Sequence, residues 1–330
     1  MTTHVKRFFS TLISDNAEKS LLSKDESLAL KGFLMLLIVL GHDKYLHRDG
    51  WSYQFLYSFH VYAFYYLPFL YDFKYKLIMP YVATLSRQLL VPFVMCFALL
   101  LVVSHTSGAY SLNVGKILQS LWTGDVRASL NTGGFLWFIP TYFSLMLWRQ
   151  LFYRMPIWGR IVLLVASSYS LFCWSFGWWI EIRGWIPMLG FTALAMLLPA
   201  VLCRCFVLQK SVIQWAPLLF FVLVFIKMIV YPSDYSTAYT VLNRIVSPVI
   251  IFLFIISIRS LFVSFSWIGK IGKVSFPVYL IHVFLYNAAY LCLDSRLECG
   301  VLSGLFLFIV VGGISYRIAR MKVVQFLFAK

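Results

Sequence analysis

The chain has 330 residues, of which 61% are hydrophobic and only 12% are charged, and its mean hydropathy is +0.83. Soluble domains carry about twice that charged fraction, so this composition excludes an ordinary water-soluble globular protein. Repeated apolar runs have the length of about 20 residues that a helix needs to cross a bilayer. The sequence therefore predicts an all-α polytopic membrane protein.

Residues 1–25 precede the first apolar run and are expected to form a cytoplasmic leader. Apolar side chains recur there at helical spacing, beside the basic residues Lys6 and Arg7. That pattern is typical of a short amphipathic helix on an anionic membrane surface, and a disordered polar leader is the alternative.

Ten apolar segments of helical length follow, and residues 26–330 are predicted to form a single transmembrane domain of about ten helices. The predicted spans are residues 28–46, 53–71, 85–104, 134–152, 160–177, 185–203, 212–231, 241–259, 274–293 and 301–319. Between the third and the fourth span, residues 116–122 are expected to form an interfacial helix.

The net charge of +16 is distributed among the loops and not gathered on one helix face. If both termini are cytoplasmic, most of the 28 Lys and Arg residues fall on the inner side, as expected from the positive-inside pattern. The basic charge therefore indicates contact with a lipid bilayer and not with nucleic acid. The six cysteines lack metal-ligand spacing, so no metal site is expected.

Three of the six histidines, His42, His60 and His282, lie inside predicted spans. Ionisable side chains inside a membrane are costly, and they mark functional sites by default. The rise of an α-helix places His42 about 16 Å beyond Lys31 and His60 about 10 Å into the second span from the opposite side. We therefore expect these two imidazoles at comparable depth around one cavity, with His282 nearer the middle of the bilayer.

Several short motifs resemble those of the acyltransferase-3 family of integral membrane proteins, in the branch of fucose 4-O-acetylase-like proteins and polysaccharide O-acetyltransferases. The motifs, in chain order, are Lys31-x10-His42, Phe59-His60-Val-Tyr-Ala-Phe-Tyr-Tyr, Arg87-x4-Pro92, Leu136-Trp137-Phe-Ile-Pro140 and Ile268-Gly269-Lys-Ile-Gly-Lys-Val-Ser275-x3-Tyr279-Leu-Ile-His282. The resemblance covers about residues 26 to 320. The chain departs from the family pattern at Lys31, where arginine is usual, and at Leu67-Pro68-Phe69, where the second motif usually ends in Ser-Gly.

The resemblance implies a membrane O-acyltransferase, in most cases an O-acetyltransferase, in a bacterial cytoplasmic membrane. Such an enzyme moves an acyl group from acetyl-CoA or another acyl-CoA to a hydroxyl of a cell-surface polysaccharide or its lipid-linked precursor. No permanently bound cofactor is implied, and an oligomer is compatible with it. Carried onto this chain, His42 is the expected catalytic histidine and Lys31 the basic residue on the donor side.

The chemistry of acyl transfer assigns expected roles to further residues. A neutral imidazole is the usual general base for a sugar hydroxyl, which suits His42 with His60 beside it. The oxyanion that forms on the thioester needs hydrogen-bond donors, for which His60, Tyr279 and Asn287 are candidates. Basic residues near the inner rim are expected to bind the phosphates of coenzyme A: Lys31, Arg87, Lys270 and Lys273.

Less specific interpretations stand beside these. Lys31 and Arg87 are also ordinary residues for a cytoplasmic membrane boundary, and His282 also serves to brace helix packing. Trp137 fits either an interfacial aromatic belt or stacking on a sugar. Asp43 is expected to be a solvated charge on the outer face. At the level of the whole protein, the alternatives are a component for polysaccharide or glycolipid export and an inactive partner in a glycan-assembly complex.

Overall fold

The computed structural model describes residues 20–45, 55–71, 74, 76–106, 113–123, 134–175, 188–230, 241–293 and 300–327. Every regular element within these ranges is a helix, which confirms the all-α class expected from the sequence. Residues 1–19, which hold most of the predicted leader, lie outside the described residues. The chain forms two compact units, so the single domain expected for residues 26–330 stays a prediction.

One unit comprises the described residues between 72 and 205. Its elements are α5 (Ile78–Leu85), η3 (Ser86–Leu90), α6 (Val91–Thr106), α7 (Val114–Thr123), η5 (Gly134–Trp137), α8 (Phe138–Arg154), α9 (Ile157–Ser175) and most of α11 (Met188–Val207). Tyr81 and Leu85 on α5 pack on Phe143 of α8. The amphipathic helix α7 lies where the interfacial helix was predicted.

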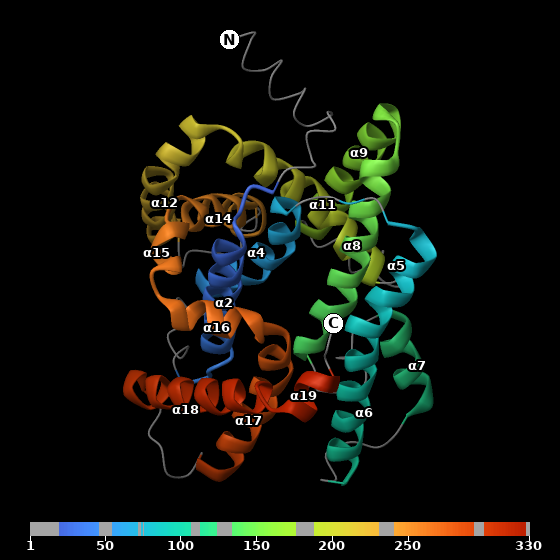
Figure 1. Cartoon of the computed structure of the whole chain (residues 1–330), viewed down its shortest axis with the longest axis vertical. Helices are drawn as coiled ribbons and strands as arrows, with labels where there is room; N and C mark the ends of the chain where they lie inside the picture. The colour runs from blue at the N-terminus through green and yellow to red at the C-terminus, as the bar shows by residue number, and fades with distance from the viewer. Residues whose placement is uncertain are drawn as a thin grey trace. The chain divides into compact units, whose positions relative to one another are not determined.

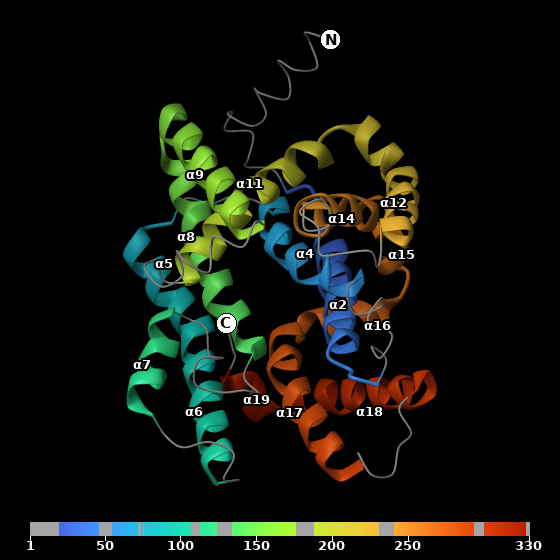
Figure 2. The same cartoon turned by 180° about the vertical axis from the view of Figure 1, so that it is seen from behind.

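The other unit comprises residues 20–71 and 206–329. Its central element is α2 (Lys24–Gly41), whose fully buried side chains include Leu30 and Leu34. Around α2 lie α4 (His60–Tyr66), α15 (Arg259–Val263), α16 (Ser266–Lys273), α17 (Ser275–Leu293) and α18 (Val301–Ala319), as Figures 1 and 2 show from opposite sides. The remaining helices of this unit are η2 (Leu67–Leu70), α12 (Lys210–Val230), η6 (Leu242–Val246), α14 (Ser247–Ser257) and α19 (Lys322–Leu327).

Four helical stretches of the described chain are long and apolar enough to cross a membrane. They are Ile78–Val103, Gly190–Val207, Lys210–Ile229 and Val301–Ala319. A fifth span results if the pair Ser266–Lys273 and Ser275–Tyr290, which is bent by 83°, is counted as one. The protein is therefore an all-α protein with several helices able to span a bilayer, whereas ten spans and cytoplasmic termini stay predictions.

The boundaries of α2 differ from the predicted span at both ends. The helix begins at Lys24, because Ser23 and Glu26 form a reciprocal capping box in which each side chain accepts from the other residue's backbone N–H. It ends at Gly41, and His42 is the C-cap residue with φ −89° and ψ 0°. The prediction that His42 lies inside a helix is therefore wrong, since this residue occupies the helix terminus.

The second predicted span is also interrupted. In its described part, α4 begins at His60, and η2 continues from Leu67 with Pro68 in its first turn. Proline lacks an N–H and has a fixed φ, so it suits the start of such a turn. In front of His60, residues 55–57 are helical and a tight turn follows at Ser58 and Phe59.

Candidate active site at the end of α2

Two imidazoles meet where α2 ends against α17. The ring centroids of His42 and His282 are 4.9 Å apart, with an interplanar angle of 73°. His42 Nδ1 lies 2.8 Å from the carbonyl oxygen of Ile38, and His282 Nδ1 lies 3.1 Å from that of Val278. A carbonyl oxygen only accepts hydrogen bonds, so in the neutral rings both Nδ1 atoms carry the proton.

These tautomers define what the pair can do chemically. His282 Nε2 lies 3.3 Å from His42 Nδ1 and, in this tautomer, accepts from that N–H, which it shares with the Ile38 carbonyl. The lone pair of His42 is then on Nε2, the ring nitrogen on the side away from Ile38. A histidine whose Nδ1–H is held by acceptors and whose Nε2 carries the lone pair has the arrangement of a general base.

Burial separates His42 from the other histidines of the site. The side chains of His60 and His282 are fully buried, whereas His42 is only half-buried. Only His42 therefore offers part of its ring to a substrate without a rearrangement of the protein.

His60 reaches the same region from the first position of α4. Its Nδ1 contacts the Leu56 carbonyl, and the other edge of its ring lies against Gly41, where an added Cβ would be 3.4 Å from Cε1 and Nε2. The Tyr57 ring lies 4.8 Å from the His60 ring and 6.1 Å from the His42 ring. The structure thus brings His42 and His60 together around the Tyr57 ring, whereas their depth in a bilayer stays a prediction.

Tyrosines on one face of α17 complete the cluster. The rings of Tyr279 and Tyr286 lie 5.9 Å and 6.4 Å from that of His282, and Tyr290 stacks on Tyr286 at 5.7 Å. The Tyr290 hydroxyl donates to the carbonyl of His42 at 3.3 Å and accepts from the backbone N–H of Lys44 at 2.9 Å. It therefore holds the backbone of the turn that follows α2.

Tyr57, Tyr286 and Tyr290 were not recognised as site residues from the sequence. A usable signal exists for the two on α17, since Tyr286 and Tyr290 follow His282 at intervals of four residues and so share its helix face. Asn287, a predicted oxyanion donor, is half-buried but is rotated from His282 by about 140° at 3.6 residues per turn. It therefore faces away from the histidine pair.

Asp43 differs most from its expected surroundings. It was predicted to be solvated, yet it is fully buried, and its Oδ1 accepts from the backbone N–H of Tyr45 at 2.9 Å. The turn after α2 folds back, because Tyr290 binds its backbone, and that fold encloses the carboxylate.

Three of the four predicted donor-side cations lie near the middle of α2 or on α16, which crosses it there. Lys31 Nζ lies 5.0 Å from the centre of the Tyr71 ring, and Lys270 and Lys273 are exposed on α16. Helix α16 crosses α2 so closely that a Cβ on Gly272 would be 1.9 Å from the Leu28 carbonyl oxygen. Lys270 and Lys273 therefore belong to the helix that contacts α2 at Leu28, one turn before Lys31.

Arg87 and Trp137 belong to the other unit. Arg87 is exposed within the π-helical turn η3. Trp137 is half-buried at the end of η5, and its carbonyl accepts from the Thr141 hydroxyl at 2.9 Å. Their roles in donor and sugar binding stay predictions.

A buried lysine contacts the turn that precedes His60. Lys227 of α12 is 4% exposed, and its Nζ donates to the Ser58 hydroxyl at 2.8 Å and lies 5.4 Å from the Phe55 ring. Ser58 in turn donates to the Phe55 carbonyl at 2.7 Å. This bond ties α12 to the turn before His60. A hydropathy pattern does not reveal this bond, because it depends on residues 169 positions apart in the sequence.

No family model matches the sequence, and neither a curated protein nor a solved structure is similar enough to it to count as a match. A functional assignment therefore depends on the arrangement of the side chains.

Proposed function

We propose that this protein is an integral-membrane O-acyltransferase of the acyltransferase-3 type, located in a bacterial cytoplasmic membrane. It moves an acyl group, acetyl in the simplest case, from acyl-CoA to a hydroxyl of a surface polysaccharide or its lipid-linked precursor. The observation that carries this proposal is the position of the half-buried His42, whose Nδ1 lies within hydrogen-bond distance of the Ile38 carbonyl and of His282 Nε2.

In the proposed reaction, the acceptor hydroxyl donates its hydrogen bond to Nε2 of His42. As the hydroxyl oxygen attacks the thioester carbonyl carbon, its proton passes to Nε2. The carbon–sulfur bond then breaks, and the leaving thiolate of coenzyme A takes the proton from Nε2. The imidazolium that exists in between donates from Nδ1 to two acceptors, the Ile38 carbonyl and His282 Nε2, which favour its positive charge.

The first test compares cell-surface glycans from cells that carry the wild-type chain, His42→Ala or His105→Ala, with ester-linked acetate measured by mass. Loss of a general base costs about 100-fold or more, so His42→Ala should abolish esterification while glycan export continues. His105 ends α6 in the other unit and serves as a matched histidine control. Loss of export with the esters intact would instead identify the protein as an export component.

The role of His282 is tested with purified protein in the same assay. His282→Leu removes the acceptor for His42 Nδ1–H, and a hydrogen bond to a charged group contributes about 1.5–3 kcal/mol. Since each 1.36 kcal/mol is tenfold in rate, kcat should fall about 10-fold to 100-fold with little change in KM. His282→Gln keeps an acceptor and should recover part of that loss, which a purely structural role does not predict.

The donor side is tested by acetyl-CoA binding. Lys31→Ala should weaken binding more than Lys31→Arg, because arginine keeps the charge and adds a planar fork suited to phosphate. Equal binding by the two variants would remove Lys31 from the donor site.

A further inference from the structure

Helix α18 carries a continuous apolar stripe on its exposed surface. Leu302, Phe306 and Ile309 are 83%, 56% and 69% exposed and recur at intervals of three and four residues, so they share one helix face. Gly313 continues the same stripe, and a Cβ added there meets nothing within 4 Å. Only 22% of the most apolar window of this helix is buried, as expected for a span that faces lipid.

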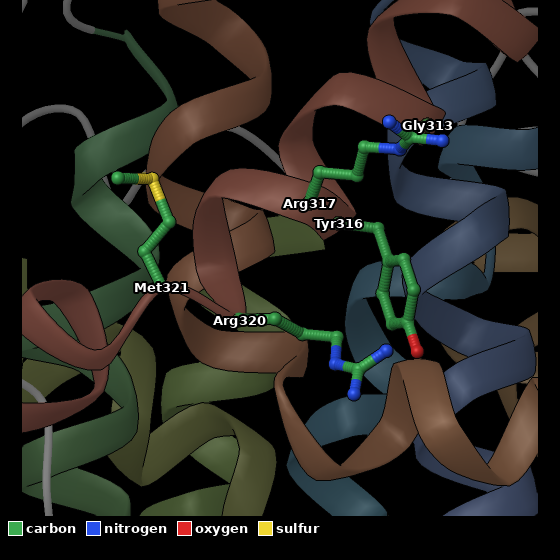
Figure 3. A pocket seen from close by; sticks show the side chains of 5 residues that line it. All are labelled: Gly313, Tyr316, Arg317, Arg320 and Met321. Carbon is green, nitrogen blue, oxygen red and sulfur yellow. The ribbon is translucent and has the colours of Figure 1, made fainter.

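The stripe ends in a pocket that is lined by cations. The pocket has a volume of about 650 Å³ and is lined by Gly313, Tyr316, Arg317, Arg320 and Met321. Figure 3 shows the Tyr316 phenol and both arginine side chains extending from α18 toward the same side. The Arg320 guanidinium carbon lies 5.6 Å from the centre of the Tyr316 ring, which fixes one cation against the pocket wall.

The positive charge of this pocket is not compensated by acidic residues nearby in the sequence. Residues 301–330 contain no aspartate or glutamate, and both arginines are exposed. Among the described residues of this unit, Glu26 forms an ion pair with Arg259 and with neither of these two arginines. Two guanidinium groups one helical turn apart suit a phosphate, which arginine binds through paired charge-assisted hydrogen bonds.

We propose that this surface of α18 binds an anionic phospholipid. Its phosphate lies between Arg317 and Arg320, and one acyl chain runs over Gly313 along the stripe toward Phe306. Along α18 the surface is first apolar, then open at Gly313, and then cationic. Such a lipid has its acyl tail, glycerol region and phosphate in the same order. This site is independent of the acyl-transfer reaction.

The alternative is an ordinary membrane-boundary helix end, whose cations interact with the bilayer surface without a defined site. A defined lipid site and a general boundary charge differ in whether lipid binding depends on the shape of the surface. A defined site requires the open surface at Gly313, whereas a general boundary charge depends only on the number of cations.

The test measures phosphatidylglycerol and phosphatidylcholine retained by the full-length protein in detergent, by native mass spectrometry over a series of lipid concentrations. Arg317→Gln with Arg320→Gln should weaken phosphatidylglycerol binding by about tenfold or more, because each charged hydrogen bond contributes at least about 1.5 kcal/mol. Lys210→Gln with Lys322→Gln removes the same charge from exposed positions outside the pocket and should have little effect.

The shape of the site is tested without any change of charge. Gly313→Leu should weaken phosphatidylglycerol binding, whereas Gly269→Leu, at a helical glycine with equally open surroundings, should not. Equal binding of the two lipids, equal losses from both charge-neutralised pairs, or an unaffected Gly313→Leu variant would overturn the proposal. Displacement of phosphatidylglycerol by coenzyme A would also overturn it and assign the pocket to a water-soluble phosphate.

Discussion

The close backbone approach between α2 and α16 predicts a strong and unequal response to alanine at two glycines of α16. A Cβ at Gly272 would lie 1.9 Å from the Leu28 carbonyl oxygen, whereas ordinary contact begins near 3.4 Å. The helices must therefore separate by about 1.5 Å to admit one methyl group. At Gly269, three residues earlier on α16, an added Cβ meets nothing within 4 Å.

Gly269→Ala and Gly272→Ala share one stabilising contribution to the free energy of unfolding, and only Gly272→Ala adds a destabilising one. Alanine in place of glycine within a helix stabilises by about 1 kcal/mol in both variants. Overpacking at Gly272 costs about 1–3 kcal/mol, and more if the backbone cannot shift, because the obstructing atom is a carbonyl oxygen and not a flexible side chain. Gly269→Ala should therefore unfold at a higher temperature than the wild type, and Gly272→Ala at a lower one.

The measurement is thermal unfolding of each purified variant in the same detergent. Gly32 occupies the other side of the crossing, with the Ile268 carbonyl oxygen 1.9 Å from its added Cβ, so Gly32→Ala should behave like Gly272→Ala. The double variant should lose less than the sum of the two, since one separation of the helices relieves both contacts. Equal midpoints for Gly269→Ala and Gly272→Ala would refute the close crossing.

Three further predictions concern the polar contacts of the same unit. Burial raises the pKa of Glu26, but hydrogen bonds from Ser23 and from Arg259, together with the charge of Arg259, more than offset this and hold that pKa below 4.5. The wild type should therefore be more stable than Arg259→Gln by up to about 1 kcal/mol above pH 4.5, and the difference should vanish as the pH falls through the lowered pKa, as measured by unfolding at several pH values. Ser58→Ala removes the hydroxyl acceptor of the buried Lys227 ammonium and should destabilise the protein by about 1.5–3 kcal/mol, whereas an unchanged midpoint would show that this bond is not formed. Tyr290→Phe removes both hydroxyl bonds to the turn after α2 and should speed amide hydrogen exchange there while leaving α2 itself protected.

The sequence predicts the helices well because a bilayer makes apolar length the dominant signal. The apolar runs at 212–231 and 301–319 correspond to α12 and α18 within about two residues at each end. The ends of α2 were misplaced, because they depend on contacts that a hydropathy pattern does not contain. Its start depends on the Ser23 capping box, and its end depends on Tyr290, which lies 248 residues from His42 in the sequence.

In the candidate site, too, some features follow from the sequence pattern and others depend on tertiary contacts. Helix rise predicts that His42 and His60 lie at a similar level, and the structure brings both to the Tyr57 ring. The rotation of a helix about its axis does not follow from hydropathy, which is why Asn287 was assigned to the site although it faces away from it. Close crossings such as that of α16 on α2 also escape prediction, since one glycine by itself does not identify the backbone that it contacts.

The position of His42 at the helix terminus, and not inside a span, has a direct chemical consequence. The Ile38 carbonyl accepts from the His42 backbone N–H at 3.2 Å and also lies 2.8 Å from His42 Nδ1. The His42 carbonyl, beyond the last helical residue, accepts from the Tyr290 hydroxyl. The same terminus carries the negative end of the helix dipole, which stabilises a nearby imidazolium by about 0.3–1 kcal/mol at exposed sites and by up to about 2 kcal/mol in partly buried ones. A histidine within a helix can also reach the carbonyl four residues earlier, as His282 does with Val278, but it lies away from the negative end of the dipole. The early end of α2 therefore favours the cation that a general base forms when it takes a proton.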